Sequence, residues 1–569
     1  MTGAPDTSTE IFLAKAEIAG GAPERAVLRL SRLVARASGD PIPHYWLAAA
    51  LGATRDWVGH RAALRNAQAL HALRVIANAG GDLDRLRSDP VYATQIGDTL
   101  YGQRMVGLAS AAYGLAADRT PDNAGLLVRY GLSLQHQGRV EEAVNAFRRV
   151  WALAPTNHQA RGFLLYALFH VPDGVKVHAQ AAREFARLYD DAPRKPAESF
   201  TNRPLRGRKL RIGYVAPDVM GTQLRQFIGP VFEHHDREAV EVFHYMHAAP
   251  AVPPPFGQVR VIGALSDEQA ARLIRDDRVD VLIDLWGHTA NGRLGVFARR
   301  AAPVQASWAN YIQTTGLTEM DYLIHSNALK APGAQEDCTE TIWYIGPDLA
   351  TFRPDPRPDP TPTPALAAGY VTFGSYTHPV RLSDQTIDGW SRILKAVEGS
   401  RLVLRYGYYA DEVVKNTILT RFAARGVAQS RIHFRGHAVQ PEYYQSYAEI
   451  DFALDPAPCP AGTTSFDALA NGVPVLTLAG PDYYSRIGVA NTAPMGLHEL
   501  NTESWDEYVE RAVELTADPQ ALDALRRRVR AAFDASSRCD EAGFTRRFEA
   551  TLTDMFQRWR EERRTEAAA

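Results

Sequence analysis

A proline-rich segment divides the chain, and it limits the possible folds more than any other feature. Seven prolines fall between Gly346 and Gly369. Proline fixes the backbone φ angle and donates no backbone hydrogen bond, so this density excludes a helix or a central strand. The segment therefore predicts an extended linker at residues 347–369 that joins two separately folded regions.

Strand-like and helix-like stretches alternate on both sides of this linker. Before it, short β-rich runs occupy residues 210–216, 241–246, 279–287, 303–310 and 321–326. After it, similar runs occupy residues 371–376, 401–407, 431–437, 451–457 and 473–480. Strands that alternate with helices are typical of parallel sheets, so we expect two α/β lobes, at residues 208–346 and 370–569.

In residues 1–200, apolar residues recur every three or four positions, as in helices. The pattern repeats with a period of 34 residues. One copy, residues 124–157, matches the tetratricopeptide signature at Leu127, Tyr130, Gly131, Leu134, Gly138, Ala143, Phe147, Val150 and Pro155. A second set of matches lies 34 residues earlier, and a weaker copy lies near the N-terminus. We expect a superhelix of tetratricopeptide repeats, which would bind a protein segment along its concave face. A generic helical bundle is the alternative.

Charge and composition exclude several classes of protein. The 569 residues include 63 Lys and Arg and 65 Asp and Glu, a net charge of −2. This balance argues against a nucleic-acid or membrane partner held by bulk charge. Three cysteines are too few for a disulfide framework, which favours a reducing cytoplasm. The polar N-terminus and the absence of a long apolar run predict neither a signal peptide nor a transmembrane helix.

Residues 451–480 predict a site for an anion. They form a strand, a loop rich in proline and glycine, and a helix that begins at Gly462, Thr463 and Thr464. Free amides at a helix start favour a phosphate, and the two hydroxyls add donors. Asp467, one turn into the helix, is placed to accept from ribose hydroxyls. The alternative is that Thr463 caps the helix and Asp467 complements its dipole.

Other polar candidates follow strands of the two lobes. Asp218 is either a general base or a turn-forming residue. His288 either binds substrate or donates to a loop carbonyl. His378 and Arg381 follow the first strand of the second lobe, where a cation would hold a diphosphate or lie at the surface. The sequence contains no P-loop, paired-His zinc motif or nucleophile elbow, so we expect no metal and no cofactor.

Four longer motifs carry a resemblance to known proteins. They are RIGYVAPD at 211–218, DLWGHTANGRLGVFARRAAPVQASW at 284–308, TTGLTEMDY at 314–322 and AGTTSFDALANGVPVLTLAG at 461–480. With the order of repeats, lobe, linker and lobe, they resemble the O-linked N-acetylglucosamine transferase family. The resemblance implies a GT-B fold of two Rossmann-like lobes. It also implies inverting, metal-independent transfer of a sugar from a nucleotide sugar to Ser or Thr of a protein acceptor selected by the repeats.

The resemblance also implies roles for single residues. Donor-binding residues would be His378, Arg381, Ala438, Gly462, Thr463, Thr464 and Asp467. Arg381 stands where the family has a lysine that neutralises the leaving diphosphate, and Ala438 lies in the base-binding stretch. Asp218 is the leading candidate to accept the acceptor's proton, with the donor phosphate as its alternative, and His288 completes the catalytic set. A cation and a helix start would stabilise the leaving charge.

Two departures from the family leave the donor open. Thr222 stands where the family has a histidine near the sugar, and residues 312–316 differ from its Pro-Gly-Thr-Ser/Thr-Gly loop. The first candidate is therefore a donor like UDP-N-acetylglucosamine. A flagellin glycosyltransferase that uses a CMP-nonulosonic acid is the alternative, because Arg225 and Arg381 would suit a carboxylate. A non-catalytic repeat scaffold is the second alternative.

Overall fold

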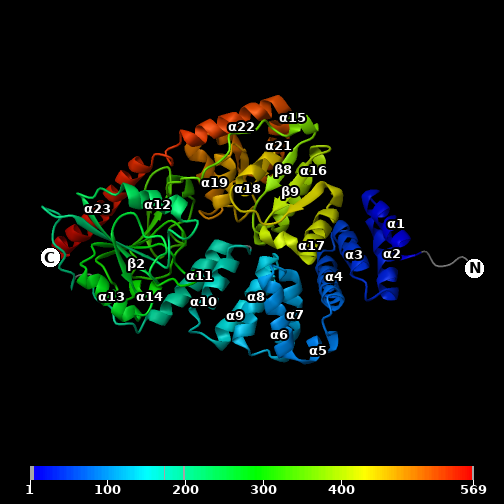
Figure 1. The fold of residues 1–569 in the computed structure, drawn as a ribbon, viewed down its shortest axis with the longest axis horizontal. Helices are drawn as coiled ribbons and strands as arrows, with labels where there is room; N and C mark the ends of the chain where they lie inside the picture. The colour runs from blue at the N-terminus through cyan, green and yellow to red at the C-terminus, as the bar shows by residue number, and fades with distance from the viewer. Residues whose placement is uncertain (1–5, 172, 197–198, 567–569) are drawn as a thin grey trace, which may run out of the picture.

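The computed structural model describes residues 6–171, 173–196 and 199–566. Figure 1 shows a curved row of helices along one side of two α/β lobes, the first lobe in green and the second in yellow and orange. The fold is the predicted one, a repeat superhelix followed by two Rossmann-like lobes. No helix in the described ranges is both long enough and apolar enough to cross a membrane.

The repeat region is built from short helices, most of them in antiparallel pairs. In the described ranges they are α1 (Thr7–Ala19), α2 (Pro23–Arg36), α3 (Pro41–Ala53), α4 (Trp57–Asn78), α5 (Leu83–Ser88), α6 (Pro90–Gly102), α7 (Val106–Arg119), α8 (Ala124–His136), α9 (Val140–Leu153), α10 (His158–Leu168) and α11 (Gly174–Ala186). The pairs α3–α4 and α10–α11 belong to the same row of helices, although the sequence showed no repeat copy at these positions.

Glycines at repeated positions let the paired helices pack closely. Gly131 of α8 faces the buried ring of Phe147 in α9, and a Cβ atom on that glycine would lie 2.5 Å from the ring. One repeat earlier, Gly97 of α6 faces the buried ring of Tyr113 in α7 and leaves no room for a side chain. In both repeats a small residue therefore faces a large buried ring, which allows close contact between the paired helices.

The first lobe is a seven-stranded parallel sheet in the order β3-β2-β1-β4-β5-β6-β7. Its strands are β1 (Leu210–Ala216), β2 (Val240–Met246), β3 (Gln258–Val261), β4 (Val281–Asp284), β5 (Val304–Ser307), β6 (Tyr322–His325) and β7 (Thr341–Tyr344). Its helices include α12 (Arg225–His234), α13 (Asp267–Asp276) and α14 (Leu294–Phe297). The strand order reverses between β1 and β4, which places a ligand crevice at the ends of these strands.

The second lobe is a six-stranded parallel sheet in the order β10-β9-β8-β11-β12-β13. Its strands are β8 (Thr372–Ser375), β9 (Arg401–Arg405), β10 (Ile432–Arg435), β11 (Phe452–Leu454), β12 (Val475–Leu478) and β13 (Asn501–Thr502). Its helices are α16 (Asp384–Ala396), α17 (Glu412–Ala423), α18 (Glu442–Gln445), α19 (Thr463–Ala470), α20 (Ile487–Thr492), α21 (Trp505–Thr516) and α22 (Pro519–Asp534). The order reverses between β8 and β11, so the second crevice lies beyond these strands.

The segment between the lobes is irregular except for the short helix α15 (Ala365–Ala368). The last helix, α23 (Glu541–Glu566), returns to the first lobe, where Phe548 stacks on Trp308 with ring centroids 4.1 Å apart. The range expected for the second lobe, 370–569, thus includes a helix of the first lobe's core. The sequence could not show this, because an amphipathic pattern does not reveal which sheet a helix covers.

The repeats contact both lobes through buried polar groups. The Gln68 side chain of α4 donates to the Thr417 hydroxyl of α17 over 2.9 Å. The His178 ring of α11 shares a 2.6 Å hydrogen bond with the Tyr311 hydroxyl of the first lobe. These contacts hold the repeats against the two lobes and so fix one wall of the cleft between them.

Candidate active site

Most of the predicted site residues gather where the two crevices face each other; Asp218 and His378 do not. The loops after β1 and β4 approach from the first lobe, and those after β8 and β11 approach from the second. Two pockets open there, and each is lined by residues from the repeats and from both lobes. The arrangement matches the general position of ligands in parallel α/β sheets.

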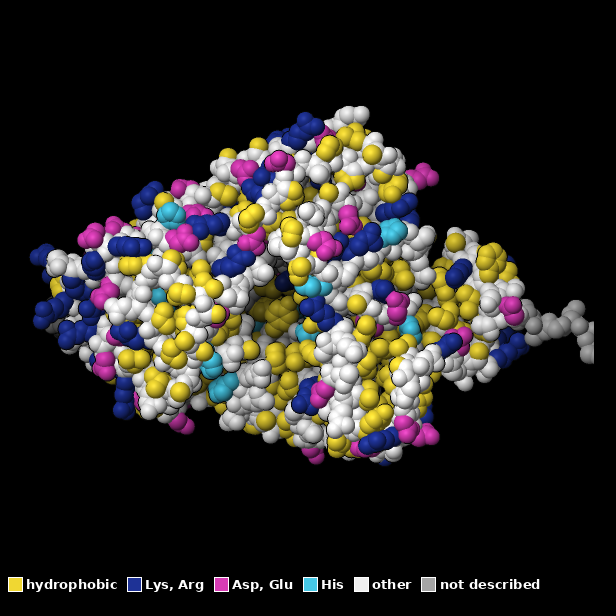
Figure 2. Space-filling model, viewed as in Figure 1, with side chains coloured by type: hydrophobic (Ala, Val, Ile, Leu, Met, Phe, Trp, Pro, Cys, Tyr) yellow, Lys and Arg dark blue, Asp and Glu magenta, His cyan; other side chains and the backbone are white. Residues whose placement is uncertain are grey.

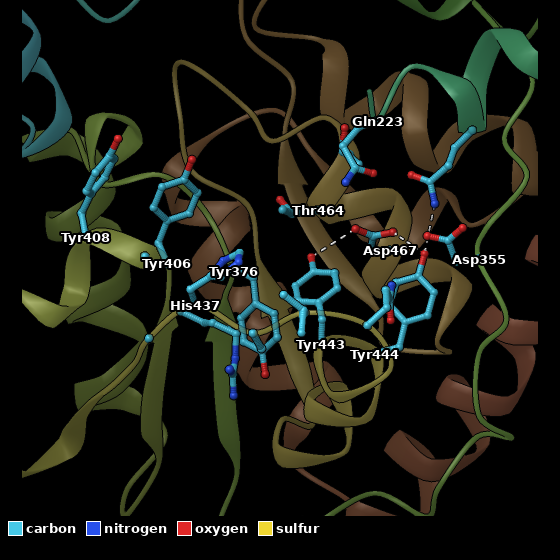
Figure 3. A pocket seen from close by; sticks show the side chains of 18 of the residues that line it. Gln223, Asp355, Tyr376, Tyr406, Tyr408, His437, Tyr443, Tyr444, Thr464 and Asp467 are labelled. Carbon is cyan, nitrogen blue, oxygen red and sulfur yellow. Dashed lines mark hydrogen bonds between the residues drawn. The ribbon is translucent and has the colours of Figure 1, made fainter. Parts of the chain in front are cut away.

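The larger pocket has a volume of about 720 Å³, and we call it the tyrosine pocket (Figure 3). Its lining consists of Arg104, Gln223, Gln226, Asp355, Tyr376, Arg405, Tyr406, Gly407, Tyr408, Gly436, His437, Ala438, Val439, Gln440, Tyr443, Tyr444, Thr463, Thr464 and Asp467. Four of the predicted donor-binding residues are in this set: Ala438, Thr463, Thr464 and Asp467. Aromatic rings next to hydroxyl and carboxylate groups suit a nucleoside, which has a flat base and a polar sugar.

Asp467 is the central carboxylate of the tyrosine pocket. Its two oxygens accept hydrogen bonds from the hydroxyls of Tyr444 and Tyr443, over 2.9 and 3.1 Å (Figure 3). The amide of Gln226, from the first lobe, donates to the Tyr444 hydroxyl over 3.4 Å and links the lobes. Burial raises the pKa of Asp467 to about 7, although the hydrogen bonds from these two hydroxyls lower it. The carboxyl therefore titrates near neutral pH.

The start of α19 presents unused donors beside Asp467. Within the described residues, the backbone N–H and hydroxyl groups of Thr463 and Thr464 donate to no other part of the chain. The preceding loop is held by the buried Asp455, which accepts from the Ala461 N–H over 2.8 Å and from the Thr477 hydroxyl over 3.0 Å. A fixed loop with free amides at a helix start is suited to a phosphate group.

The second pocket, which we call the interlobe pocket, has a volume of about 400 Å³. Figure 2 shows a hollow with hydrophobic side chains on its floor, where the repeats and both lobes meet. The pocket's lining includes Tyr166, Phe169, Leu224, Phe227, His288, Tyr311, Gln313, Arg381, Pro460, Gly462, Thr463, Phe466 and Tyr484. Thr463 lines both pockets, so they meet at the start of α19.

Arg381 brings a positive charge to the interlobe pocket. It ends the short 3₁₀ helix η4 (Pro379–Arg381), and its Nη1 donates to the Cys459 carbonyl over 3.1 Å and to the Pro460 carbonyl. Its Nε and Nη2 donate to none of the described residues. The guanidinium is thus anchored at one nitrogen and keeps the rest of its fork for a ligand.

Two of the predicted catalytic residues have local partners. The His288 ring lines the interlobe pocket, and its Nε2 lies 2.8 Å from the Thr315 carbonyl oxygen. Burial lowers the pKa of His288 to about 4, so the ring is neutral at pH 7. The Asp218 carboxylate accepts from the Gly221 N–H over 3.0 Å, as in a turn, and lines neither pocket. Its role as a base stays a prediction.

His378 lies behind the pockets rather than in them. Its Nδ1 accepts from the Val380 N–H over 3.0 Å and caps η4. Its ring contacts those of Tyr406 and of His136 in α8, with centroids 4.8 and 5.2 Å apart. Burial holds the pKa of His378 well below its usual range. The geometry therefore gives this residue a place between the repeats and Arg381.

The sequence profile of Glycosyl transferase family 41 matches residues 175–348 and 365–547, which cover most of both lobes. The chain belongs to this family. A point mutant of the O-GlcNAc transferase from Thermobaculum terrenum has the same fold, with a TM-score of 0.75 and 26% identity over 99% of this chain and 100% of that one.

Curated plant proteins are also similar to the chain. A rice protein described as "Probable UDP-N-acetylglucosamine--peptide N-acetylglucosaminyltransferase SPINDLY" is 30% identical over 433 residues. A tomato protein of the same description is 30% identical over 422 residues. The matches cover 73% and 71% of this chain but 46% and 45% of the relatives. The chain thus spans about half the length of these curated relatives.

Several residues of this family 41 site were not predicted from the sequence. Tyr443 and Tyr444 belong to α18, and Gln226 to α12, so only the tertiary fold brings them to Asp467. Gln313 is 2% exposed in the wall of the interlobe pocket, and its amide has no partner among the described residues. In the sequence, its position differs from the family's loop but carries no other signal. A buried amide without a partner is uncommon, and this one borders the interlobe pocket.

Proposed function

We propose that this protein transfers a sugar from a nucleotide-sugar donor to a Ser or Thr hydroxyl of a protein acceptor. One observation carries the proposal: the unused donors of Thr463 and Thr464 stand where the tyrosine pocket meets the interlobe pocket. A nucleoside in the first pocket and a sugar in the second would place the phosphates between them. Membership of family 41 and the names of the relatives support this activity.

The proposed chemistry stabilises a leaving group. Departure of the nucleotide places negative charge on its phosphate oxygens. The amides and hydroxyls of Thr463 and Thr464, together with the helix dipole of α19, would bind that charge. From the side of the sugar, the guanidinium of Arg381 would donate further hydrogen bonds to the phosphate oxygens. These residues supply the stabilisation of the transition state, so the proposal needs no metal ion or cofactor. A single displacement at the sugar carbon would invert its configuration.

The acceptor would approach through the interlobe pocket. Tyr166 and Phe169 of the repeats line this pocket, so a segment bound along the repeats would lead into it. The acceptor hydroxyl would attack the sugar carbon and lose its proton. Asp218 accepts only a turn amide and lies outside both pockets, which favours the donor phosphate as the proton acceptor.

We propose UDP-N-acetylglucosamine as the first donor to test, because the relatives' descriptions name it. The case for a CMP-nonulosonic acid rested in part on Arg225. That guanidinium is paired with Asp355, with Nη2 at 2.7 Å from both carboxylate oxygens. Its charge is therefore already balanced, and it is poorly suited to bind a donor carboxylate.

The experiment is a transfer assay with intact-mass detection. The purified protein is incubated with UDP-, GDP- and CMP-sugars and a library of peptides that contain Ser and Thr. We expect one donor to add the mass of one sugar to a subset of peptides. A non-catalytic scaffold would add no mass with any donor. A protein that binds no nucleotide by calorimetry and adds no mass would contradict both the proposed activity and the proposed donor site.

A further inference from the structure

The repeat region contributes one residue to the tyrosine pocket. Arg104 lies between α6 and α7, is exposed, and lines this pocket together with second-lobe residues. Its guanidinium lies against Gly407, where a Cβ atom would collide with the Arg104 Nη1. The backbone of Arg104 has a φ of 64°, a left-handed conformation that is uncommon for a residue with a side chain. In this turn, the residue at the left-handed position is the arginine that lines the pocket.

The Arg104 loop is attached to the second lobe directly on its C-terminal side and through His136 of α8 on its N-terminal side. On the C-terminal side, the Asp411 carboxylate accepts from the N–H of Gly107 over 2.7 Å and from that of Leu108 over 3.3 Å. On the N-terminal side, the Tyr101 hydroxyl lies 3.0 Å from Nδ1 of His136. The His136 ring stacks on Tyr408, with centroids 4.7 Å apart. The loop therefore has little freedom to move away from the pocket.

The charge of Arg104 has no partner in the part of the chain that the structure describes. Among the described residues, no hydrogen bond or ion pair engages its guanidinium. The other arginine of the pocket, Arg405, pairs with Glu449 over 3.3 Å. Burial raises the pKa of Tyr408 to about 12, and the positive charge of Arg104 acts against that rise. An unpaired guanidinium beside aromatic rings, in a pocket, is suited to an acceptor-rich ligand.

We propose that Arg104 binds the donor nucleotide, so that the repeat region completes the donor pocket. This inference rests on the proposed function, which places the nucleotide in the tyrosine pocket. The fork of N–H donors on Arg104 would meet either the carbonyl oxygens of the base or the phosphate oxygens. The region proposed to select the protein acceptor would thereby also set the affinity for the donor.

The test is calorimetric titration of the full chain with UDP, GDP and CMP. For the nucleotide that binds the unmodified protein, we expect Arg104→Ala to weaken binding by about 10-fold or more, because it removes hydrogen bonds to a charged group. Arg104→Lys should recover part of the loss. The matched control is Arg148→Ala, which removes an exposed arginine of α9 that lines neither pocket and should leave binding unchanged.

A second titration distinguishes the two sources of acceptor atoms. If Arg104 contacts the base, Arg104→Ala weakens nucleotide binding but not binding of inorganic pyrophosphate. If it contacts the phosphates, both ligands lose affinity. Unchanged nucleotide affinity in Arg104→Ala would overturn this inference and leave the proposed function standing. If the unmodified protein binds none of the three nucleotides, both fail together.

Discussion

The Asp411 carboxylate of the second lobe accepts a 2.7 Å hydrogen bond from the backbone N–H of Gly107 in the repeats. Its other oxygen accepts from the Val413 N–H over 2.8 Å, so one side chain caps α7 and α17 together. Asp411 is fully buried. Repeats and lobe therefore share a polar joint that neither can satisfy alone, and this joint lies beside the proposed donor pocket.

Removal of this joint should destabilise the protein more than removal of an ordinary helix cap. We expect Asp411→Ala to lower the free energy of unfolding by about 2 kcal/mol or more, since two caps worth about 1 kcal/mol each are lost. The matched control is Asp56→Ala, which removes one exposed cap of α4. Thermal unfolding of both variants measures the difference. An equal shift in the two would show that the joint contributes nothing beyond a single cap.

The affinity for nucleotide should depend on pH through Asp467. Ribose hydroxyls donate to a carboxylate, so binding favours the ionised form of Asp467. Because burial raises its pKa to about 7, affinity should rise as the pH approaches 7 and level off above about pH 8. Asp467→Asn should remove this dependence. Calorimetry across the pH range checks it, and an equally steep profile in the variant would assign the titration to another group.

Asp467 should also affect stability, with the opposite trend. Its pKa in the folded protein, about 7, lies above the ordinary value of 3.8. The folded state then binds an extra proton between these values, so stability falls as pH rises from about 4 to about 7. A comparison of unfolding midpoints for the unmodified protein and Asp467→Asn should show a smaller fall in the variant. A parallel pair of curves would contradict the raised pKa.

Arg381 should be essential for transfer. We expect Arg381→Ala to reduce turnover by about 100-fold to 1,000-fold, as loss of a group that stabilises transition-state charge does in other enzymes. Arg381→Lys keeps the charge but not the fork and should retain part of the activity. Arg392→Ala is the control, since it removes a 44% exposed arginine of α16 in the same lobe. Undiminished turnover in Arg381→Ala would exclude the assigned role.

The Asp218→Asn variant tests whether Asp218 acts as a base or only forms a turn. The asparagine side chain still accepts from the Gly221 N–H, so the turn should persist. Because Asp218 lines neither pocket, we expect turnover within about 2-fold of the unmodified enzyme, the range of a mutation that touches no reacting group. The same transfer assay measures it. A loss of 100-fold or more, with unfolding unchanged, would restore Asp218 as the proton acceptor.

The sequence predicted the central strands of each sheet and the edge strand β10, but not the edge strands β3, β7 and β13. Buried strands such as β1 and β8 appear as apolar runs, and the structure confirms them. The strands β3 and β7 lie at the two edges of their sheet, are partly exposed and contain polar residues. Their patterns resemble loops, because an edge strand buries less of its surface.

From the sequence, the candidate site was predictable only where its residues are adjacent in one segment. The start of α19 combines Gly462, Thr463 and Thr464 in a row, so a local rule for helix starts finds it. Arg104 and Tyr443 reach the tyrosine pocket from elements far apart in the chain. No local pattern marks them, since their role depends on how the repeats and lobes pack. Long-range packing of this kind becomes visible only in three dimensions.

The most direct test of the proposed function is nucleotide binding to the unmodified chain and to a Thr463→Val, Thr464→Val double variant. Valine keeps the shape of threonine but removes both hydroxyl donors at the start of α19. We expect one nucleotide among UDP, GDP and CMP to bind the unmodified protein at one site, and the double variant to bind it at least about 10-fold more weakly. Equal affinity in the two proteins, or no binding of any nucleotide to either, would contradict the donor site described above.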